Sequence, residues 1–402
     1  MIQKLEGYTH AQAEILKYVF NHGKVSRAQL AEALGISNLT VINGAKKLLE
    51  DQVLAECGTL PSARGRKVTL LSVNPELYYF LSADIGSYST KLAVVRFDGS
   101  IIYREEFINP HRNVYTTYMT PDLLRQKLAK LLQKYGKSRF WALCFSISGT
   151  VDFANKTSTF CANIQGWNGV NFQESFGDYF QMPVYLDSSG HCAAMAERQF
   201  GNSRDCSDLV FISAGCAIST GIILGGKLLR GISGAAGELG HVQVRNEGKG
   251  HNWMCTCGQR NCLEMQVTIP GIRKKLTNYR RAADPSLPED FNITDKDLHT
   301  AYTAGDPVAV KAVEDAAKIL GQQTANVADM LNPQKIIFGG GTIHYFPIMI
   351  DIVRQEINAT ALPVISRELT VEATALGPDV SLIGAALLGI FDLLKKSTEK
   401  PE

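Results

Sequence analysis

The chain has 402 residues, of which 45% are hydrophobic and 20% are charged, a composition typical of a folded globular protein of two or three domains. A formal net charge of +2 gives no global attraction to nucleic acid, so any charge that binds DNA must be local. We expect neither a secretory signal nor a stretch of roughly 20 apolar residues, which a membrane helix requires. Nine cysteines, an odd number scattered along the chain, do not resemble a disulfide framework and favour a reducing cytoplasm.

The first 50 residues have the pattern of a helix-turn-helix. Residues 11–20 place apolar side chains at helical spacing, which predicts an amphipathic first helix. The segment 26–34 begins with a serine suited to an N-cap and stops before Gly35. A further helix is predicted at 37–49, again after a serine cap. Two short helices joined by a glycine turn describe a helix-turn-helix, whose second helix can enter the major groove of DNA.

The second of these helices and the loop after it supply the predicted DNA contacts. Polar side chains near the start of the helix can reach base edges and phosphates. Predicted strands at 53–56 and 68–71 flank a loop with the cationic sequence Arg-Gly-Arg-Lys, which a wing can place in a narrow minor groove. The predicted DNA-binding residues are Ser37, Asn38, Thr40, Asn43, Lys46, Arg64, Gly65, Arg66 and Lys67. A helical hairpin for protein contacts and a solvated loop are the plainer interpretations.

After about residue 76 the pattern changes to strands and longer helices. Strands are predicted at 78–83, 90–97, 101–103, 141–147, 183–186 and 335–338. Helices are predicted at 121–135, 188–201, 269–281, 294–304 and 307–332, with a last helix from Gly384 to a polar tail at 395–402. We therefore divide the chain into a DNA-binding domain at 1–76 and a second, larger domain at 77–402.

Three cysteines within eight residues form the most specific motif in the chain. They are Cys255, Cys257 and Cys262. Gly258 lets the backbone turn tightly enough for the sulfurs to face one ion. A histidine completes the four ligands of a closed tetrahedral zinc site, and both His241 and His251 precede the cysteines closely enough. Ordinary buried thiols are the plainer interpretation.

The residues around these cysteines resemble the signature of the ROK family of sugar kinases and sugar-responsive repressors. The resemblance rests on Glu238-x-Gly-His241, followed by the three cysteines and Glu264, with Asn261 where glycine is usual. It implies that His241 holds structural zinc together with the three cysteines, and that both glutamates bind sugar hydroxyls. A metal bound at one imidazole nitrogen aims the other nitrogen at a ligand, so the metal and sugar sites would share His241.

The resemblance covers about residues 77–393 and implies an actin-like ATPase (ribonuclease H-like) α/β fold. Its two lobes would take roughly 77–186 plus the C-terminal helix, and 187–375. The winged helix in front fits the repressor branch of the family. The segments around Gly149, Asn163 and Ser188 resemble those that border the family's sugar pocket, and they add further residues to the implied binding set. That set is Gly149, Asn163, Ser188, Ser189, Glu238, His241 and Glu264.

The residues that a kinase needs depart from the family's pattern. Ser189 stands where the kinases carry the aspartate that deprotonates the sugar hydroxyl, and a serine is no general base near neutral pH. The first phosphate loop has Ser-Tyr at 87–88 where the family has Gly-Thr. The second loop keeps Gly215 and Gly221 but has alanine and serine in place of two further glycines, so side chains obstruct a phosphate cradle. We therefore expect no catalytic residue and no bound ATP.

Two functions compete on these residues. We expect a sugar-responsive transcriptional regulator, a repressor of carbohydrate-utilisation genes, that binds operator DNA as a homodimer or homotetramer. Its effector would be a sugar or sugar phosphate, and it would work in the cytoplasm without membrane contact. The alternative is an ATP-dependent sugar kinase of the same family with an accessory DNA-binding domain. A scaffold without a ligand is the third interpretation, and the retained Glu238, His241 and Glu264 argue against it.

Overall fold

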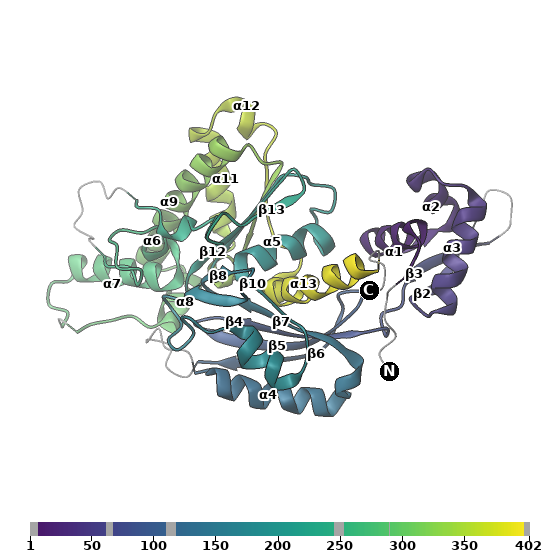
Figure 1. The fold of residues 1–402 in the computed structure, drawn as a ribbon. Coiled ribbons are helices and arrows are strands. Elements are labelled where there is room, and N and C mark those ends of the chain that lie inside the picture. The colour runs from purple at the N-terminus through teal and green to yellow at the C-terminus, as the bar shows by residue number, and fades with distance from the viewer. Residues whose placement is uncertain (1–6, 62–66, 110–117, 245–252, 289, 398–402) are drawn as a thin grey trace.

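The computed structural model of the chain has a small N-terminal unit at one end and two α/β lobes that lie against each other (Figure 1). It describes residues 7–61, 67–109, 118–244, 253–288 and 290–397.

The N-terminal unit has the arrangement of a winged helix-turn-helix, with a three-stranded sheet in the order β1-β3-β2. Its elements are α1 (His10–His22), β1 (Val25–Ser26), α2 (Arg27–Leu34), α3 (Asn38–Glu50), β2 (Leu54–Leu60) and β3 (Val68–Val73). Ser26 caps α2 in a capping box with Gln29, and α2 ends at Gly35, whose φ of 62° is left-handed. Ser37 caps α3. These local signals place the helices where the sequence predicts them.

The first lobe is built on a five-stranded sheet in the order β10-β7-β4-β5-β6. The strands are β4 (Tyr79–Ile85), β5 (Ser89–Arg96), β6 (Ile101–Ile108), β7 (Phe140–Ile147) and β10 (Val184–Ser188), and β8 (Thr150–Asp152) and β9 (Thr157–Phe160) form a separate hairpin. Successive side chains of a strand point to opposite faces. Leu81 of β4 therefore shares a core with α4 (Pro121–Tyr135), whereas Phe80 shares one with α13 (Val380–Lys396).

The second lobe carries another five-stranded sheet, in the order β13-β12-β11-β14-β15. Its strands are β11 (Leu209–Ala214), β12 (Ile218–Leu224), β13 (Lys227–Leu229), β14 (Lys335–Gly339) and β15 (Thr370–Ala373). Its helices are α6 (Glu264–Val267), α7 (Ile269–Ala283), α8 (Asp295–Thr303), α9 (Pro307–Leu331), α10 (Gly341–Tyr345), α11 (Ile348–Thr360) and α12 (Pro363–Ser366). Elsewhere in the chain, η1 (Lys137–Arg139), η3 (Leu239–His241) and η4 (Gly377–Asp379) are short 3₁₀ helices, and η2 (Gln173–Asp178) is a π-helix. The buried faces of α7, α9 and α11 share one core with β11 and β14.

Helix α5 (Ser189–Phe200) starts where β10 ends and joins the two lobes. A Cβ on Gly190 would lie 2.5 Å from backbone atoms of β12, and one on Gly221 would overlap the Gly190 carbonyl. Gly384 of α13 is as close to α5, because its Cβ would overlap the Cys192 carbonyl. Gly221 therefore lets β12 and α5 pack backbone to backbone.

The N-terminal unit and the first lobe share one hydrophobic core. Phe20 of α1 packs against three aromatic rings, with centroid distances of 5.8 Å to Phe97, 6.1 Å to Phe200 and 6.2 Å to Phe391. The last two rings belong to α5 and α13, so both helices run from the gap between the lobes to the N-terminal unit. In Figure 1, α13 lies between the sheet of the first lobe and α1.

The last helix differs from the sequence prediction in two ways. It begins at Val380, four residues before the predicted Gly384, and continues through Lys396 into the segment predicted to be a polar tail. The stretch Gly377–Lys396 is also long and apolar enough to cross a membrane by length and composition, contrary to our expectation. It packs against β4, β7 and α5, and 61% of its apolar window is buried. It is therefore a core helix of the first lobe.

Candidate functional site

Four soft ligands meet at the edge of the second lobe. The ligand atoms of His241, Cys255, Cys257 and Cys262 all lie within 4.8 Å of one another. The Nδ1 atom of His241 lies 3.7 Å from Cys255 Sγ, and the sulfurs of Cys257 and Cys262 are also 3.7 Å apart. His241 ends η3, and the cysteines lie on a turn in which the Gly258 N–H donates to the Cys255 carbonyl at 2.9 Å. The turn and η3 together gather the four ligands.

These spacings fit a zinc ion. Zinc–sulfur bonds of about 2.3 Å separate two sulfurs of a tetrahedral site by about 3.8 Å. The observed Cys257–Cys262 separation of 3.7 Å matches that edge, whereas a disulfide bond is about 2.05 Å long. His241 is the histidine at the cluster, and His251 lies outside the described residues. Asn261, which stands where the family signature has glycine, adopts a left-handed φ of 60° that asparagine tolerates.

The cysteine turn also positions a residue of the predicted sugar site. Thr256, between two of the cysteines, donates from its hydroxyl to Asn163 Oδ1 at 2.8 Å. Asn163 in turn donates from Nδ2 to Glu264 Oε1 at 3.1 Å. The second oxygen of Glu264 accepts from the Ile218 N–H at 3.0 Å. A threonine between two cysteines gave no signal in the sequence, because its partner lies 93 residues away.

Glu264 and Glu238 differ in exposure. Glu264 is 4% exposed, and burial raises its pKa although the bonds from Ile218 and Asn163 oppose that shift. The side chain of Glu238 is 41% exposed, and its Oε2 lies 3.7 Å from Nε2 of His241. His241 thus turns Nδ1 toward the cysteines and Nε2 toward Glu238. The structure brings together four residues of the predicted sugar set, which are Asn163, Glu238, His241 and Glu264.

The remaining residues of the predicted sugar set, Gly149, Ser188 and Ser189, each make a contact within the protein. The Ser188 hydroxyl caps α5 by accepting from the His191 N–H at 3.4 Å. Gly149 has a φ of 148°, and a Cβ there would lie 2.8 Å from Cys161 Sγ, so it serves a close packing contact. Ser189 Oγ hydrogen-bonds Ser219 Oγ at 3.0 Å. This bond joins two of the positions at which the sequence departs from the kinase pattern.

Asp187, the carboxylate nearest to Ser189 in sequence, lies on β10 and is 1% exposed. Its Oδ1 accepts from the Ser188 N–H at 2.8 Å and lies 2.7 Å from His191 Nδ1. Its Oδ2 accepts from Arg230 at 2.9 Å. Both carboxylate oxygens are therefore engaged inside the protein.

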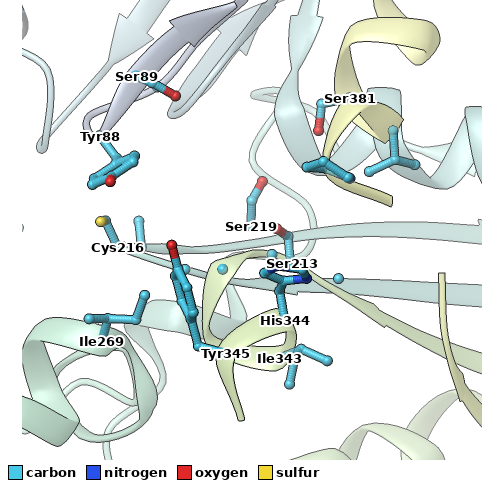
Figure 2. Close-up of a pocket in the computed structure, with 18 of the residues that line it drawn as sticks. Tyr88, Ser89, Ser213, Cys216, Ser219, Ile269, Ile343, His344, Tyr345 and Ser381 are labelled. Carbon is cyan, nitrogen blue, oxygen red and sulfur yellow. The ribbon is translucent and has the colours of Figure 1, made fainter. Parts of the chain in front are cut away.

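A cavity of about 750 Å³ lies between the lobes next to Ser189 (Figure 2). The two predicted phosphate loops line it, with Tyr88 from the first and Cys216 and Ser219 from the second. Figure 2 shows the ring of Tyr88 above that of Tyr345, with Cys216 beside them. Burial raises the pKa of Cys216 to about 12, so its thiol is neutral at ordinary pH.

Helix α3 turns a mixed polar and apolar face outward. At about 100° per residue, Leu39, Asn43 and Lys46 stand opposite the buried stripe of the helix. Leu39 is 66% exposed and Ile42 is 49% exposed, and neither was among the predicted contacts. Asn38 is exposed, whereas the hydroxyl of Thr40 bonds Ser37 Oγ at 2.9 Å. Leu39 and Ile42 are apolar and would be expected to be buried, so the sequence alone did not indicate that they face solvent.

The predicted wing is described in part. Strands β2 and β3 pair antiparallel and flank it, and Lys67 at its end is exposed. Arg64, Gly65 and Arg66 lie outside the described residues.

Comparisons with known proteins agree with these features. The model of the ROK family matches residues 80–390. A xylose repressor of Bacillus spizizenii is 23% identical over 95% of both chains, and a glucokinase of Halalkalibacterium halodurans is 27% identical over 77% of this chain and 94% of its own. A solved ROK family transcriptional regulator, a homolog of the Escherichia coli MLC protein, superimposes with a TM-score of 0.75 at 24% identity over 96% of both chains. This likeness confirms the predicted fold, an actin-like α/β fold in two lobes behind a winged helix-turn-helix.

Proposed function

The chain belongs to the ROK family, and from this premise we propose that it is a sugar-responsive transcriptional regulator, a repressor of carbohydrate-utilisation genes in the cytoplasm. The observation that carries the proposal is the extent of the likeness. The repressor and the solved regulator match nearly the whole chain, including the N-terminal unit, whereas the glucokinase matches a smaller part of it.

The sugar or sugar phosphate is proposed to bind beside the cysteine turn. Glu264 and Asn163 are fixed by their bonds to each other and to Ile218 and Thr256, while Glu238 remains partly open to solvent. Carboxylate and amide groups held in this way can read a pattern of hydroxyls, because preorganised acceptors and donors lose little freedom on binding. Zinc at His241 and the three cysteines is proposed to be structural, holding the loop that carries Thr256.

DNA is proposed to bind to α3 and the wing. A single helix-turn-helix reads only a short half-site, so we propose a homodimer or homotetramer on a palindromic operator. Asn43 and Lys46 on the outward face of α3 supply a base-edge reader and a phosphate contact. Leu39 and Ile42 add apolar surface that suits the methyl group of thymine.

The alternative function, a sugar kinase with an accessory domain, lacks a base at the expected place. The Ser189 hydroxyl is bonded to Ser219, and the neighbouring carboxylate of Asp187 is engaged by Arg230 and His191. We propose that the chain is not an enzyme.

The test is selection of binding sites from random duplex DNA by the full-length protein, followed by titration of the selected duplex. We expect a palindromic site whose affinity falls with salt and changes when the effector sugar is added. The variant Asn43→Ala with Lys46→Ala should weaken binding by about 10- to 100-fold, because a base contact and a phosphate contact are lost together. A Glu32→Ala variant, altered at an exposed position on α2, is the control. Failure to select any site, or equal binding by the double variant, contradicts the proposed DNA contact.

A further inference from the structure

The cavity between the lobes is adjacent to the proposed sugar site. Ser189, a member of the predicted sugar set, lines the cavity. Ser148, which precedes Gly149 of that set, lines it as well. Ser219, which bonds Ser189, directly follows Ile218, whose N–H holds Glu264. Two adjacent residues of β12 therefore link Glu264 to the lining of the cavity. Its volume of about 750 Å³ falls in the range of about 300–1,000 Å³ that ligand pockets occupy.

The walls of the cavity are rich in hydroxyls and carry aromatic rings. Seven serines line it, namely Ser87, Ser89, Ser148, Ser189, Ser213, Ser219 and Ser381. The rings of Tyr88 and Tyr345 come from different lobes and border the space from two sides (Figure 2). Asn109 holds the backbone of the first loop, because its N–H donates to the Tyr88 carbonyl at 2.9 Å. Hydroxyls with flat apolar faces suit a sugar ring, which presents hydroxyls at its edge and C–H groups on its faces.

The charge of the cavity does not suit a phosphate. Among the described residues that line it, the formal charges come from Asp84, Glu106, Asp295, Lys91 and Lys296, which sum to −1. The Lys91 ammonium is already bonded to the Pro378 carbonyl. Burying a dianionic phosphate requires several cations or backbone donors aimed at it. An uncharged extension of the ligand is therefore favoured over a phosphoryl group or a nucleotide.

Resting on the proposed sugar-sensing function, we propose that the effector is an uncharged oligosaccharide or glycoside. Its first sugar ring binds at Asn163, Glu238 and Glu264, and its second ring occupies the cavity between Tyr88 and Tyr345. The cavity between the lobes is thus the second subsite of the sugar site. Affinity for the second ring comes from stacking and from serine hydroxyls, without a charge on the ligand.

The first experiment compares ligands on the full-length protein by thermal shift and calorimetry. The probes are glucose and xylose, their disaccharides maltose, cellobiose, isomaltose and xylobiose, glucose 6-phosphate, and ATP. A ligand of the native state raises the melting temperature by mass action. We expect one disaccharide to bind at least about tenfold more tightly than its own monosaccharide. Tighter binding of glucose 6-phosphate or ATP than of every disaccharide overturns the inference.

The second experiment locates the second ring with variants. Tyr88→Ala should weaken the best disaccharide about tenfold and leave the monosaccharide unchanged, because only the second ring contacts Tyr88. Tyr345→Leu, which keeps an apolar side chain, is an independent variant with the same expected pattern. Tyr179→Ala is the control, since Tyr179 is 64% exposed and is not among the residues that line the cavity. Unchanged disaccharide affinity in both cavity variants overturns the inference.

The two levels of the proposal fail differently. Glu264→Gln should weaken monosaccharide and disaccharide alike, because both place a ring at Glu264. If this loss occurs while disaccharides bind no better than monosaccharides, the sugar sensor stands and the second subsite is rejected. If no sugar raises the melting temperature, both are rejected.

Discussion

The two sides of the interlobe site use their polar groups differently. On the side of the cysteine cluster, Thr256, Asn163 and Glu264 form a chain of hydrogen bonds that starts between two cysteines and ends at a backbone N–H. On the phosphate side, the Ser189 hydroxyl bonds the Ser219 hydroxyl and the Ser189 carbonyl accepts from Ser381, while Tyr88 lines the cavity from the first loop. The first side is preorganised for a ligand. The second has hydroxyls where phosphoryl transfer needs a base and backbone donors.

Under the proposed function, the residues that recognise the sugar are separate from those that a kinase would use. Thr256, Asn163 and Glu264 are joined by hydrogen bonds, so a change in one disturbs the others. Ser189 is bonded to Ser219 and Ser381 instead, and the start of the helix keeps its cap at Ser188. Variants on the two sides should therefore differ sharply in effect.

The largest effect is expected from removing a metal ligand. Cys257→Ser should abolish stoichiometric zinc and lower sugar affinity by on the order of 100-fold or more, because the metal holds the turn that carries Thr256. Elemental analysis and calorimetry measure the two quantities. Cys57→Ser, at a half-buried cysteine in the N-terminal unit, should change neither. A zinc-free protein that binds sugar normally contradicts the structural role of the metal.

A smaller loss is expected when the charge of the central carboxylate is removed. Glu264→Gln keeps the shape of the side chain but places an amide N–H₂ against the Asn163 or Ile218 donor. Losing a charged hydrogen bond costs about 1.5–3 kcal/mol, or about 10- to 150-fold in sugar affinity. The zinc content should remain at one per chain. A drop in zinc would show that Glu264 supports the metal site rather than the sugar.

Thr256→Val should sharpen the comparison further. Valine replaces the hydroxyl by a methyl group and frees Asn163 Oδ1, at a cost of about 0.5–1.5 kcal/mol. Sugar affinity should fall by about two- to tenfold with zinc retained. Thr256→Ser keeps the hydroxyl and should restore most of the affinity. Equal affinities for the valine and serine variants contradict the positioning role.

Sequence reasoning succeeded where the determinants are local. The serine caps and Gly35 fix α2 and α3, and the spacing of the cysteines indicated the metal cluster. It failed where a residue's role is set by a distant partner. The close packing of Gly221 against Gly190 is an example, because no local pattern in the sequence indicates it.

The bonds that define the two sides of the site are also long-range. Thr256 and Asn163 are 93 residues apart, and Ser189 and Ser219 are 30 apart. No periodicity or spacing rule connects such pairs, because the topology of the two sheets brings them together. The start of α13 differs from the prediction for a simpler reason. The sequence predicts that Gly384 opens the helix, but the helix already begins at the apolar residue Val380.

The smallest effect is expected on the phosphate side, where Ser189→Asp should restore no phosphoryl transfer. Positioning by the intact sugar site would be enough if only the base were missing, because a well-placed base raises rates by about 10²–10⁴. The new carboxylate would instead face Ser219, in a cavity whose lining already carries a formal charge of −1 and whose loops offer side chains in place of a phosphate cradle.

The measurement is a coupled kinase assay with ATP on the wild type, Ser189→Asp and the uncharged control Ser189→Asn, alongside calorimetric titration with ATP. We expect all three proteins to match a mock purification and none to bind ATP. Turnover by the aspartate variant alone would show that the phosphate side is intact apart from its base, and the two sides would then differ by one residue. Turnover by the wild type would instead restore the kinase alternative. Asp187→Asn would then be tested first, although Arg230 and His191 already engage that carboxylate.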